Sequence, residues 1–347
     1  MKRGTISSGV VLAVAAAVAF GSTTPFVHRF GMGVGPLMTA CLLYSGAALM
    51  GILWRGRPGI EARVGRSHLP RILLVAMAGA VIAPTALAWG LQRADATSAS
   101  LLLNFEAIAT VLLARLFFDE AIGRRIWMAV LLMLVAGAIL VPASARAATS
   151  TPWGLAAVMV ATLAWAVDNT LTRPLSDLDP MGIIVRKASF GASFTAGLAL
   201  AFHEPLPPMT NAAVLLVCGA TGYGLSLRLY LLAQRRLGVA RTGSVFAVAP
   251  FIGAAGAWML GDGRVNGATV LAGVLFAGAV YLHLSEQHAH EHTHEPIEHD
   301  HAHRHDDGHH GHAHEAPVAG VHSHSHHHDQ TTHAHDHAPD VHHEHAH

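Results

Sequence analysis

Ionisable side chains inside apolar segments are the first candidates for chemistry in this sequence, because a charged group at membrane depth is costly and is usually kept for a function. Glu106 lies near the middle of the apolar segment 96–118, two residues after Asn104, and no basic residue lies at its depth. A carboxylate in that position could exchange a proton with its surroundings in each working cycle. Glu106 and Asn104 are therefore the first predicted site residues.

A second group of ionisable residues lies near one end of three other apolar segments. Asp168 is about 8 Å from Arg173 at the rise of an α-helix, and Lys187 and Arg228 fall at a similar level in their own segments. We expect these three charges to form one ion-paired cluster, with Asn169 beside it. A structural alternative stays open, in which the charges only neutralise one another and the basic side chains extend to the lipid headgroups.

Possible metal ligands are concentrated at the C-terminal end. Residues 288–347 hold 24 of the 28 histidines, mostly as His-x-His repeats with interleaved carboxylates. Neutral imidazole is the commonest protein ligand for zinc, nickel, cobalt and copper(II), and carboxylates can add oxygen ligands. The predicted metal ligands are His288, His290, His292, His294, His299, His301, His303, His305, His310, His312, His314, His333, His335 and His337.

Two other interpretations of the tail stay open. It could be a solvated low-complexity extension with no metal-dependent role. Its imidazoles, with an ordinary pKa of about 6.5, could also make its charge respond to pH. In each case residues 286–347 are predicted to be disordered, because they carry almost no large apolar side chains.

The rest of the chain has the composition of an integral membrane protein. Of its 347 residues, 52% are hydrophobic and 13% are charged, and the mean hydropathy is +0.40, a balance that a water-soluble domain of this size does not need. A membrane-spanning helix needs about 20 apolar residues. Such windows predict ten spans, at residues 6–26, 36–54, 72–91, 96–118, 126–141, 153–171, 181–202, 212–232, 239–260 and 265–284.

Basic residues predict the orientation of these spans, since Lys and Arg near span ends stay on the cytoplasmic side. With the N-terminus inside, thirteen of them lie at inner ends and loops and four at outer ones. We therefore expect a multi-pass protein of the cytoplasmic membrane, with both termini in the cytoplasm.

The apolar region reads as a duplication. The pairs Gln92/Gln234 and Glu120/Asp262 are each 142 residues apart, and Phe20/Trp165 are 145 residues apart. The sequence thus predicts an all-α membrane protein built from two inverted five-helix repeats, residues 6–142 and 153–285. Many secondary transporters are duplicated in this way, with the substrate path between the halves.

Corresponding short motifs occur in the two halves. In the first, the segment 96–101 leads to Phe118-Asp-Glu120, and in the second, the segment 239–245 leads to Ala249-Pro250-Phe251 and Asp262. These motifs resemble those of the drug/metabolite transporter superfamily, EamA type. The resemblance covers roughly residues 6–284 and leaves the tail outside. It implies ten helices in two halves and transport of a small solute.

The leading hypothesis is a permease or exporter for a small polar metabolite, coupled to a proton or an ion, with Glu106 as the coupling carboxylate. Lys187 and Arg228 would attract a carboxylate or phosphate of the substrate, while Asp168 and Asn169 would orient it or close an inner gate. One alternative is a permease or exporter of zinc, nickel or cobalt ions. A second is a metal-responsive membrane protein that transports nothing.

The expected partners are the lipid bilayer, a small-molecule solute and divalent metal on the tail. No cofactor is required, and the tail is expected to bind Zn, Ni, Co or Cu(II). No catalytic constellation stands out, so an enzyme is not predicted, and without a nucleotide-binding loop ATP is not expected to supply energy. No nucleic acid is expected as a partner. The sequence leaves a homodimer open.

Overall fold

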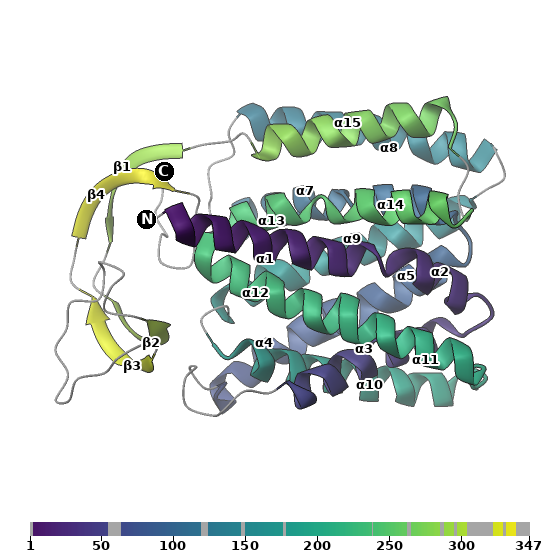
Figure 1. Ribbon diagram of the computed structural model, residues 1–347, viewed down its shortest axis with the longest axis horizontal. Helices are drawn as coiled ribbons and strands as arrows, with labels where there is room; N and C mark the ends of the chain where they lie inside the picture. Colours follow the sequence, from purple (N-terminus) through teal and green to yellow (C-terminus); the bar gives the residue numbers. More distant parts are fainter. Residues whose placement is uncertain are drawn as a thin grey trace.

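The helices of the protein lie side by side in one bundle. In this computed structural model the described residues are 3–54, 64–118, 124–146, 150–175, 178–237, 239–261, 265–284, 288–294, 297–303, 322–328 and 331–337. Helix α1 begins and helix α15 ends at the same end of the bundle, next to the tail strands (Figure 1). We call this the tail end, and the opposite one the far end. A chain whose first helix begins and whose last helix ends at the same end of the bundle is expected to cross the bundle an even number of times.

In the part of the first half that the structure describes, there are eight α-helices and two shorter helical segments. The α-helices are α1 (Arg3–Gly21), α2 (Thr24–Gly31), α3 (Pro36–Leu53), α4 (Leu69–Ala76), α5 (Ala83–Leu91), α6 (Ala96–Leu102), α7 (Phe105–Phe118) and α8 (Arg124–Arg146). A 3₁₀ turn, η1 (Arg66–His68), precedes α4, and a π-helical segment, η2 (Met77–Ile82), joins α4 to α5.

The second half has a similar order of elements. Its α-helices are α9 (Pro152–Thr172), α10 (Pro180–Ala201), α11 (Met209–Cys218), α12 (Ser226–Leu237), α13 (Val239–Phe246), α14 (Ala249–Met259) and α15 (Gly267–Leu284). A 3₁₀ turn, η3 (Arg173–Leu175), follows α9, and a second π-helical segment, η4 (Gly219–Leu225), joins α11 to α12.

Eight helical segments within the described residues are long and apolar enough to cross a membrane. They are Ser8–Gly31, Pro36–Leu53, Arg66–Leu91, Ala96–Phe117, Trp127–Ser144, Pro152–Thr172, Pro180–Ala201 and Met209–Arg236. They coincide with the first eight predicted spans. The predicted ninth span is divided into α13 and α14, and the tenth contains the shorter apolar helix Gly267–Leu282. The count of ten stays a prediction.

Prolines and glycines explain the interruptions of the spans. Pro25, Pro84 and Pro250 each occupy the first turn of a helix, where a missing N–H is tolerated. Pro84 cannot donate to the carbonyl four residues earlier, and the chain widens into the π-helical segment η2 directly before it. In η4, a Cβ at Gly219 would overlap the backbone of Leu43, so glycine allows η4 to approach α3 closely.

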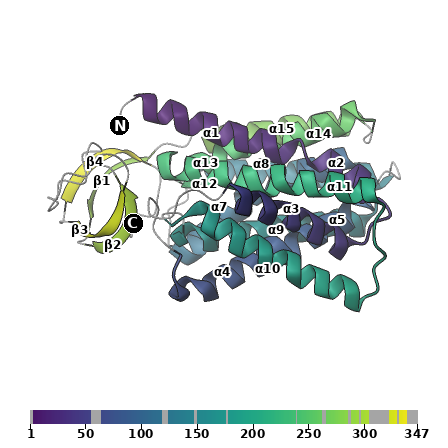
Figure 2. The same cartoon turned by 60° about the horizontal axis from the view of Figure 1, so that its bottom comes forward.

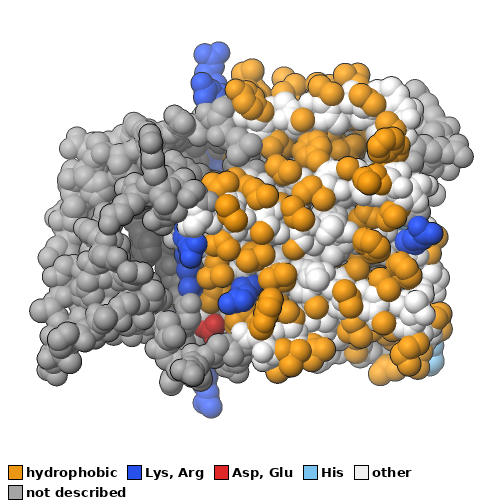
Figure 3. Space-filling view, in the orientation of Figure 1, with side chains coloured by type: hydrophobic (Ala, Val, Ile, Leu, Met, Phe, Trp, Pro, Cys, Tyr) orange, Lys and Arg blue, Asp and Glu red, His pale blue; other side chains and the backbone are white. Residues whose placement is uncertain are grey.

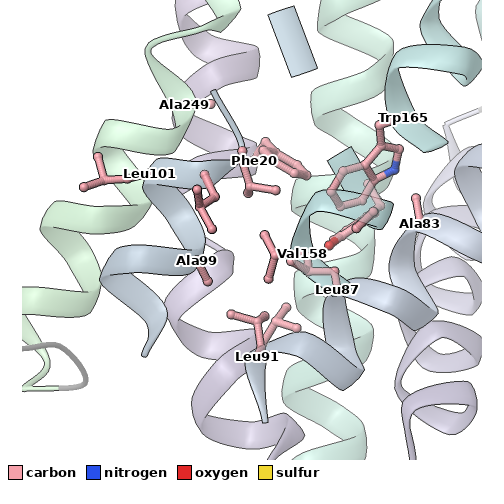
Figure 4. Close-up of a cluster of buried hydrophobic side chains, with 14 of the residues drawn as sticks. Phe20, Ala83, Leu87, Leu91, Ala99, Leu101, Val158, Trp165 and Ala249 are labelled. Atoms are coloured by element: carbon pink, nitrogen blue, oxygen red, sulfur yellow. The ribbon is translucent and has the colours of Figure 1, made fainter. Parts of the chain in front are cut away.

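Aromatic side chains form the centre of the buried core. The ring of Phe20 on α1 lies 5.6 Å from the rings of both Trp165 and Tyr223 and 5.7 Å from that of Phe246, measured between centroids. These three partners come from α9, η4 and α13. Figure 4 shows Phe20 and Trp165 beside the buried aliphatic side chains of α5, α6 and α9. The core therefore joins elements of both halves.

The outside of the bundle is apolar. Hydrophobic side chains cover the face seen in Figure 3, and most of the Lys and Arg side chains visible there lie toward the tail end. Large apolar residues such as Leu53 and Leu116 are 75% and 73% exposed. Exposed apolar area on this scale marks a surface that contacts lipid.

The turn between α2 and α3, at the far end, is held by side chains from elsewhere in the chain. The amide of Gln92 donates hydrogen bonds to the carbonyls of Gly31 (3.1 Å) and Val34 (2.7 Å). The carboxylate of Glu204 accepts from two backbone N–H groups in the first turn of α3. These groups have no partner within the helix, so Glu204 acts as a remote N-terminal cap.

Four strands lie among the described residues of the tail, and they pair at the tail end of the bundle (Figure 2). Strand β1 (His288–His294) is antiparallel to β4 (Thr331–His337), and β2 (Ile297–His303) is antiparallel to β3 (His322–His328). The sequence predicts disorder here, and the described backbone differs from that prediction. The His-x-His repeat has the two-residue period of a strand, which suits it to pairing. Because a lone two-stranded ribbon is marginal in water, disorder of the free tail stays a prediction.

Candidate functional site

A buried ion pair lies near the tail end of the bundle. Asp168 on α9 and Lys187 on α10 are each only 4% exposed, and the Lys187 ammonium donates to Oδ2 of Asp168. The hydroxyl of Thr172, one turn further along α9, donates to the other carboxylate oxygen at 3.2 Å. Charges buried to this degree persist only when they are paired and hydrogen-bonded. The pair is therefore electrically neutral as a unit.

The π-helical segment η2 supports this pair from the side. A Cβ at Gly79 would overlap the carboxylate of Asp168, so glycine is needed for the helix to pass so closely. The carbonyl of Gly79 accepts two hydrogen bonds, one from the Tyr44 hydroxyl and one from the Trp165 indole N–H at 3.2 Å. Segment η2 is thus fastened to both α3 and α9.

A second carboxylate lies on the neighbouring helix. The Asn169 amide on α9 donates to Oε1 of Glu106 on α7 at 2.7 Å. Glu106 is in the first turn of α7, directly after the break between α6 and α7, where the helix dipole favours negative charge. Since Asp168 and Asn169 are consecutive, α9 connects the ion pair to Glu106. The structure brings together four of the six predicted site residues.

Asn104 lies in the break itself. It is 1% exposed, and its side-chain N–H donates to the carbonyl of Leu101 at 2.9 Å, which completes the turn at the end of α6. Its side-chain oxygen has no hydrogen-bond partner among the described residues. Asn104 therefore stabilises the local break, and no described bond links it to the Glu106–Asn169 pair.

Arg228 departs from the predicted cluster of three charges. Within the described part of the chain, the ion pair joins Asp168 to Lys187, whereas the guanidinium of Arg228 lies 5.5 Å from the centre of the Trp54 ring. Trp54 follows the last residue of α3 at the tail end and is 53% exposed. The predicted cluster was based on depth along the spans, and depth does not say which neighbour a helix face meets. The Arg228 guanidinium makes a cation–π contact with Trp54 in place of the predicted ion pair with Asp168.

The comparison with known proteins agrees with this architecture. Residues 7–141 match the EamA-like transporter family. The EamA match contains Asn104 and Glu106 and ends before α9, so the ion pair lies beyond it.

An uncharacterised transporter of Methanothermobacter thermautotrophicus is 28% identical to this chain over 206 residues, which is 58% of this chain. The chain spans 60% of the length of that relative. A crystal structure of another protein superposes with a TM-score of 0.61 and 19% sequence identity, over 80% of this chain and 96% of that one. This likeness shows a shared fold.

Sequence reasoning missed Tyr44, Gly79 and Thr172. Tyr44 could have been predicted, because it lies within an apolar segment and a buried tyrosine hydroxyl needs a hydrogen-bond partner. Three of the four tyrosines, Tyr44, Tyr223 and Tyr230, are buried, whereas Tyr281 is 70% exposed. The role of Gly79 could not be predicted, since it depends on which helix passes beside it.

The predicted metal ligands of the tail stay a prediction. No group of three or more His, Cys, Asp or Glu side chains that could hold a metal ion occurs among the side chains that the structure describes. The backbone of the tail strands is described without its side chains. His305, His310, His312 and His314, together with the repeat markers Glu120 and Asp262, lie outside the described residues.

Proposed function

We propose that this chain is a multi-pass secondary transporter, a permease or exporter that carries a small polar metabolite across the cytoplasmic membrane, coupled to a proton or another ion. The observation that carries the proposal is the Glu106–Asn169 hydrogen bond, which joins α7 of the first half to α9 of the second beside a buried ion pair. The EamA match and the transporter relative support the same class of function.

The proposal includes two inverted five-helix repeats, residues 6–142 and 153–285, with the solute passing between them. Its support is the packing of the helices. Helix α1 packs on α12 as α9 packs on α5, while α3 packs on α10, α6 on α14 and α8 on α15. Counted by whole predicted spans, with α6 in the fourth and α14 in the ninth, exchanging the two halves maps this set of contacts onto itself, as expected for a pseudo-twofold relation.

The interruptions of the helices support the same duplication. The π-helical segments η2 and η4 begin at Met77 and Gly219, which are 142 residues apart, the offset that separates Gln92 from Gln234. The breaks between α6 and α7 and between α13 and α14 also occupy corresponding places. Such interrupted helices line the substrate path in many transporters.

In the proposed cycle Lys187 binds the acidic group of the solute. In the described state its charge is neutralised by Asp168, so an incoming carboxylate or phosphate competes with Asp168 for the ammonium. Removing one partner leaves an uncompensated buried charge, so the pair opens only when the solute replaces it. Arg228, near the rim of the tail end, would attract the same anion on its way in.

Glu106 would couple the ion to the solute. An ionised Glu106 accepts the hydrogen bond of Asn169 and holds α7 against α9, whereas a protonated one is a weaker acceptor. Protonation of Glu106 therefore weakens the contact between α7 and α9. Coupling requires a proton to stabilise one arrangement of the two halves more than another. The tail end would face the cytoplasm, in line with the predicted excess of inner basic residues.

A metal permease is less well supported. Lys187 would repel a dication at the same site, and the described side chains of the bundle offer no group of metal ligands. The tail is instead proposed to bind Zn, Ni, Co or Cu(II) at the membrane surface.

Counterflow in proteoliposomes tests the transport proposal. Metabolites carrying a carboxylate or phosphate would first be screened for those that raise the thermal stability of the purified protein. Vesicles preloaded with an unlabelled hit should then accumulate the labelled compound, and Lys187→Met should abolish accumulation. Absence of counterflow for every stabilising compound would overturn transport of such solutes, and metal-only flux in the intact chain would favour the metal permease.

A further inference from the structure

The pairing of the tail strands sets histidines opposite one another. In the β1–β4 ribbon, three pairs occupy directly opposite register positions: His288 with His337, His290 with His335, and His292 with His333. In the β2–β3 ribbon, three more do so: His299 with His326, His301 with His324, and His303 with His322. Of the fifteen histidines in the four strands, twelve belong to these six pairs.

All the pairs of one ribbon share a face. Alternate residues of a strand lie on the same side of a sheet, and the paired histidines are two residues apart throughout. The intervening register positions of the first ribbon hold other residues, such as Ala289 opposite Asp336 and Glu291 opposite Ala334. In each ribbon, six paired histidines and one more, His294 in the first and His328 in the second, therefore occupy register positions of one face.

The spacing of such pairs suits a transition metal. Directly opposite residues in an antiparallel ribbon have Cβ atoms about 4.5–5.5 Å apart, and successive pairs on one face follow at about 7 Å. Zinc binds imidazole nitrogen at about 2.0–2.1 Å and prefers four ligands in a tetrahedron. One opposed pair can supply two ligands, and two successive pairs can supply four.

We propose that the tail is a metal-dependent folding element: it is disordered when free, and divalent zinc or a similar ion folds it into two ribbons by binding to the opposed histidine pairs. The inference rests on the proposed metal-binding character of the tail and is independent of transport. A two-stranded ribbon alone is marginal in water. An ion that binds only the paired form stabilises that form by mass action, so metal binding and folding are coupled.

This proposal differs from unspecific chelation by a flexible histidine tract. Chelation of that kind depends on the number of histidines, whereas ribbon formation depends on their positions. Histidines in the strands and histidines in the 304–321 segment between β2 and β3 should therefore make different contributions. A chain folded in this way would also bring residue 288 close to residue 337, a large contraction of the tail.

Distance measurement on the full-length protein tests the inference. Spin labels at Ala289→Cys and Ala338→Cys, in a Cys41→Ser, Cys218→Ala background, report the approach of β1 and β4 by pulsed electron paramagnetic resonance. With a chelator present we expect a broad distribution of distances, and with Zn²⁺ a single short one. Mg²⁺, which prefers oxygen ligands, should not produce the change.

Two triple variants with equal loss of histidine provide the matched comparison. His333→Ala, His335→Ala, His337→Ala removes one side of the β1–β4 pairs and should abolish the short distance. His309→Ala, His310→Ala, His312→Ala removes three histidines from the 304–321 segment and should retain it. The proposal fails if both variants respond alike, if Zn²⁺ does not order the unmodified tail, or if the short distance persists in the chelator. None of these outcomes bears on solute counterflow.

Discussion

Asn169 and Glu106 are joined by a hydrogen bond of 2.7 Å between two helices, α9 and α7, that belong to different halves of the chain. The residue before Asn169 forms the buried ion pair with Lys187, and both residues of that pair come from the second half. The two contacts therefore differ in kind. The ion pair can move as a unit with the second half, whereas the Glu106–Asn169 hydrogen bond must break if the two halves separate.

Glu106→Gln should uncouple solute movement from the proton. The substitution keeps the shape of the side chain and an acceptor for Asn169, but it removes the ionisable group. We expect solute counterflow to continue and uptake driven by a pH gradient to disappear, both measured in proteoliposomes. Glu204→Gln at the far end is the control, because this carboxylate contacts only the backbone start of α3 in the bonds described. Gradient-driven uptake that survives in Glu106→Gln would refute the coupling role.

Asp168→Asn should be more harmful than the double change Asp168→Asn, Lys187→Met. The single change leaves a buried ammonium without its counter-charge, at a cost of about 3–5 kcal/mol in the free energy of unfolding. The double change removes both charges and should recover part of that loss. Thermal unfolding in detergent measures the difference as a double-mutant cycle. Lys187→Met completes the cycle, and a double variant whose loss of stability equals the sum of the two single losses would mean that the ion pair contributes no coupling energy.

Gly79→Ala should lower stability and disturb the ion pair, since a Cβ at this position would overlap the carboxylate of Asp168. Gly197→Ala on α10 is the matched control, because a Cβ there meets nothing within 4 Å. Alanine favours a helix by about 1 kcal/mol over glycine, so the control should be neutral or slightly stabilising. A Gly79 variant as stable as the Gly197 variant would show that η2 can move away from α9 at little cost.

Much of the fold could be predicted from the sequence, because apolar segments of membrane length are a direct consequence of the bilayer as solvent. Eight predicted spans coincide with apolar helices of the described chain. The π-helical segments η2 and η4 were not predicted. They depend on local hydrogen bonding that composition does not record.

Part of the candidate site could also be predicted from the sequence. Charged residues in apolar segments are conspicuous, so Glu106, Asp168 and Lys187 were found by depth alone. Depth does not fix the rotation of a helix about its axis, and this is why Arg228 was placed with Asp168 although it lies against Trp54. Gly79 and Thr172 carry no charge, and their importance depends on contacts with Asp168 that only the folded chain reveals.

Tyr44→Phe should loosen the attachment of η2 to α3 without emptying the core. The change removes the hydroxyl that donates to the Gly79 carbonyl, while the Trp165 indole continues to donate to the same oxygen. One acceptor bond remains, so the loss should be the net value of a single hydrogen bond, about 0.5–1.5 kcal/mol. Tyr281→Phe, at a position 70% exposed, should change stability by less. Chemical denaturation in mixed micelles measures the free energy of unfolding of both variants. The Trp165→Phe, Tyr44→Phe double variant should lose more stability than the two single changes together, because the Gly79 carbonyl is then buried without either side-chain donor.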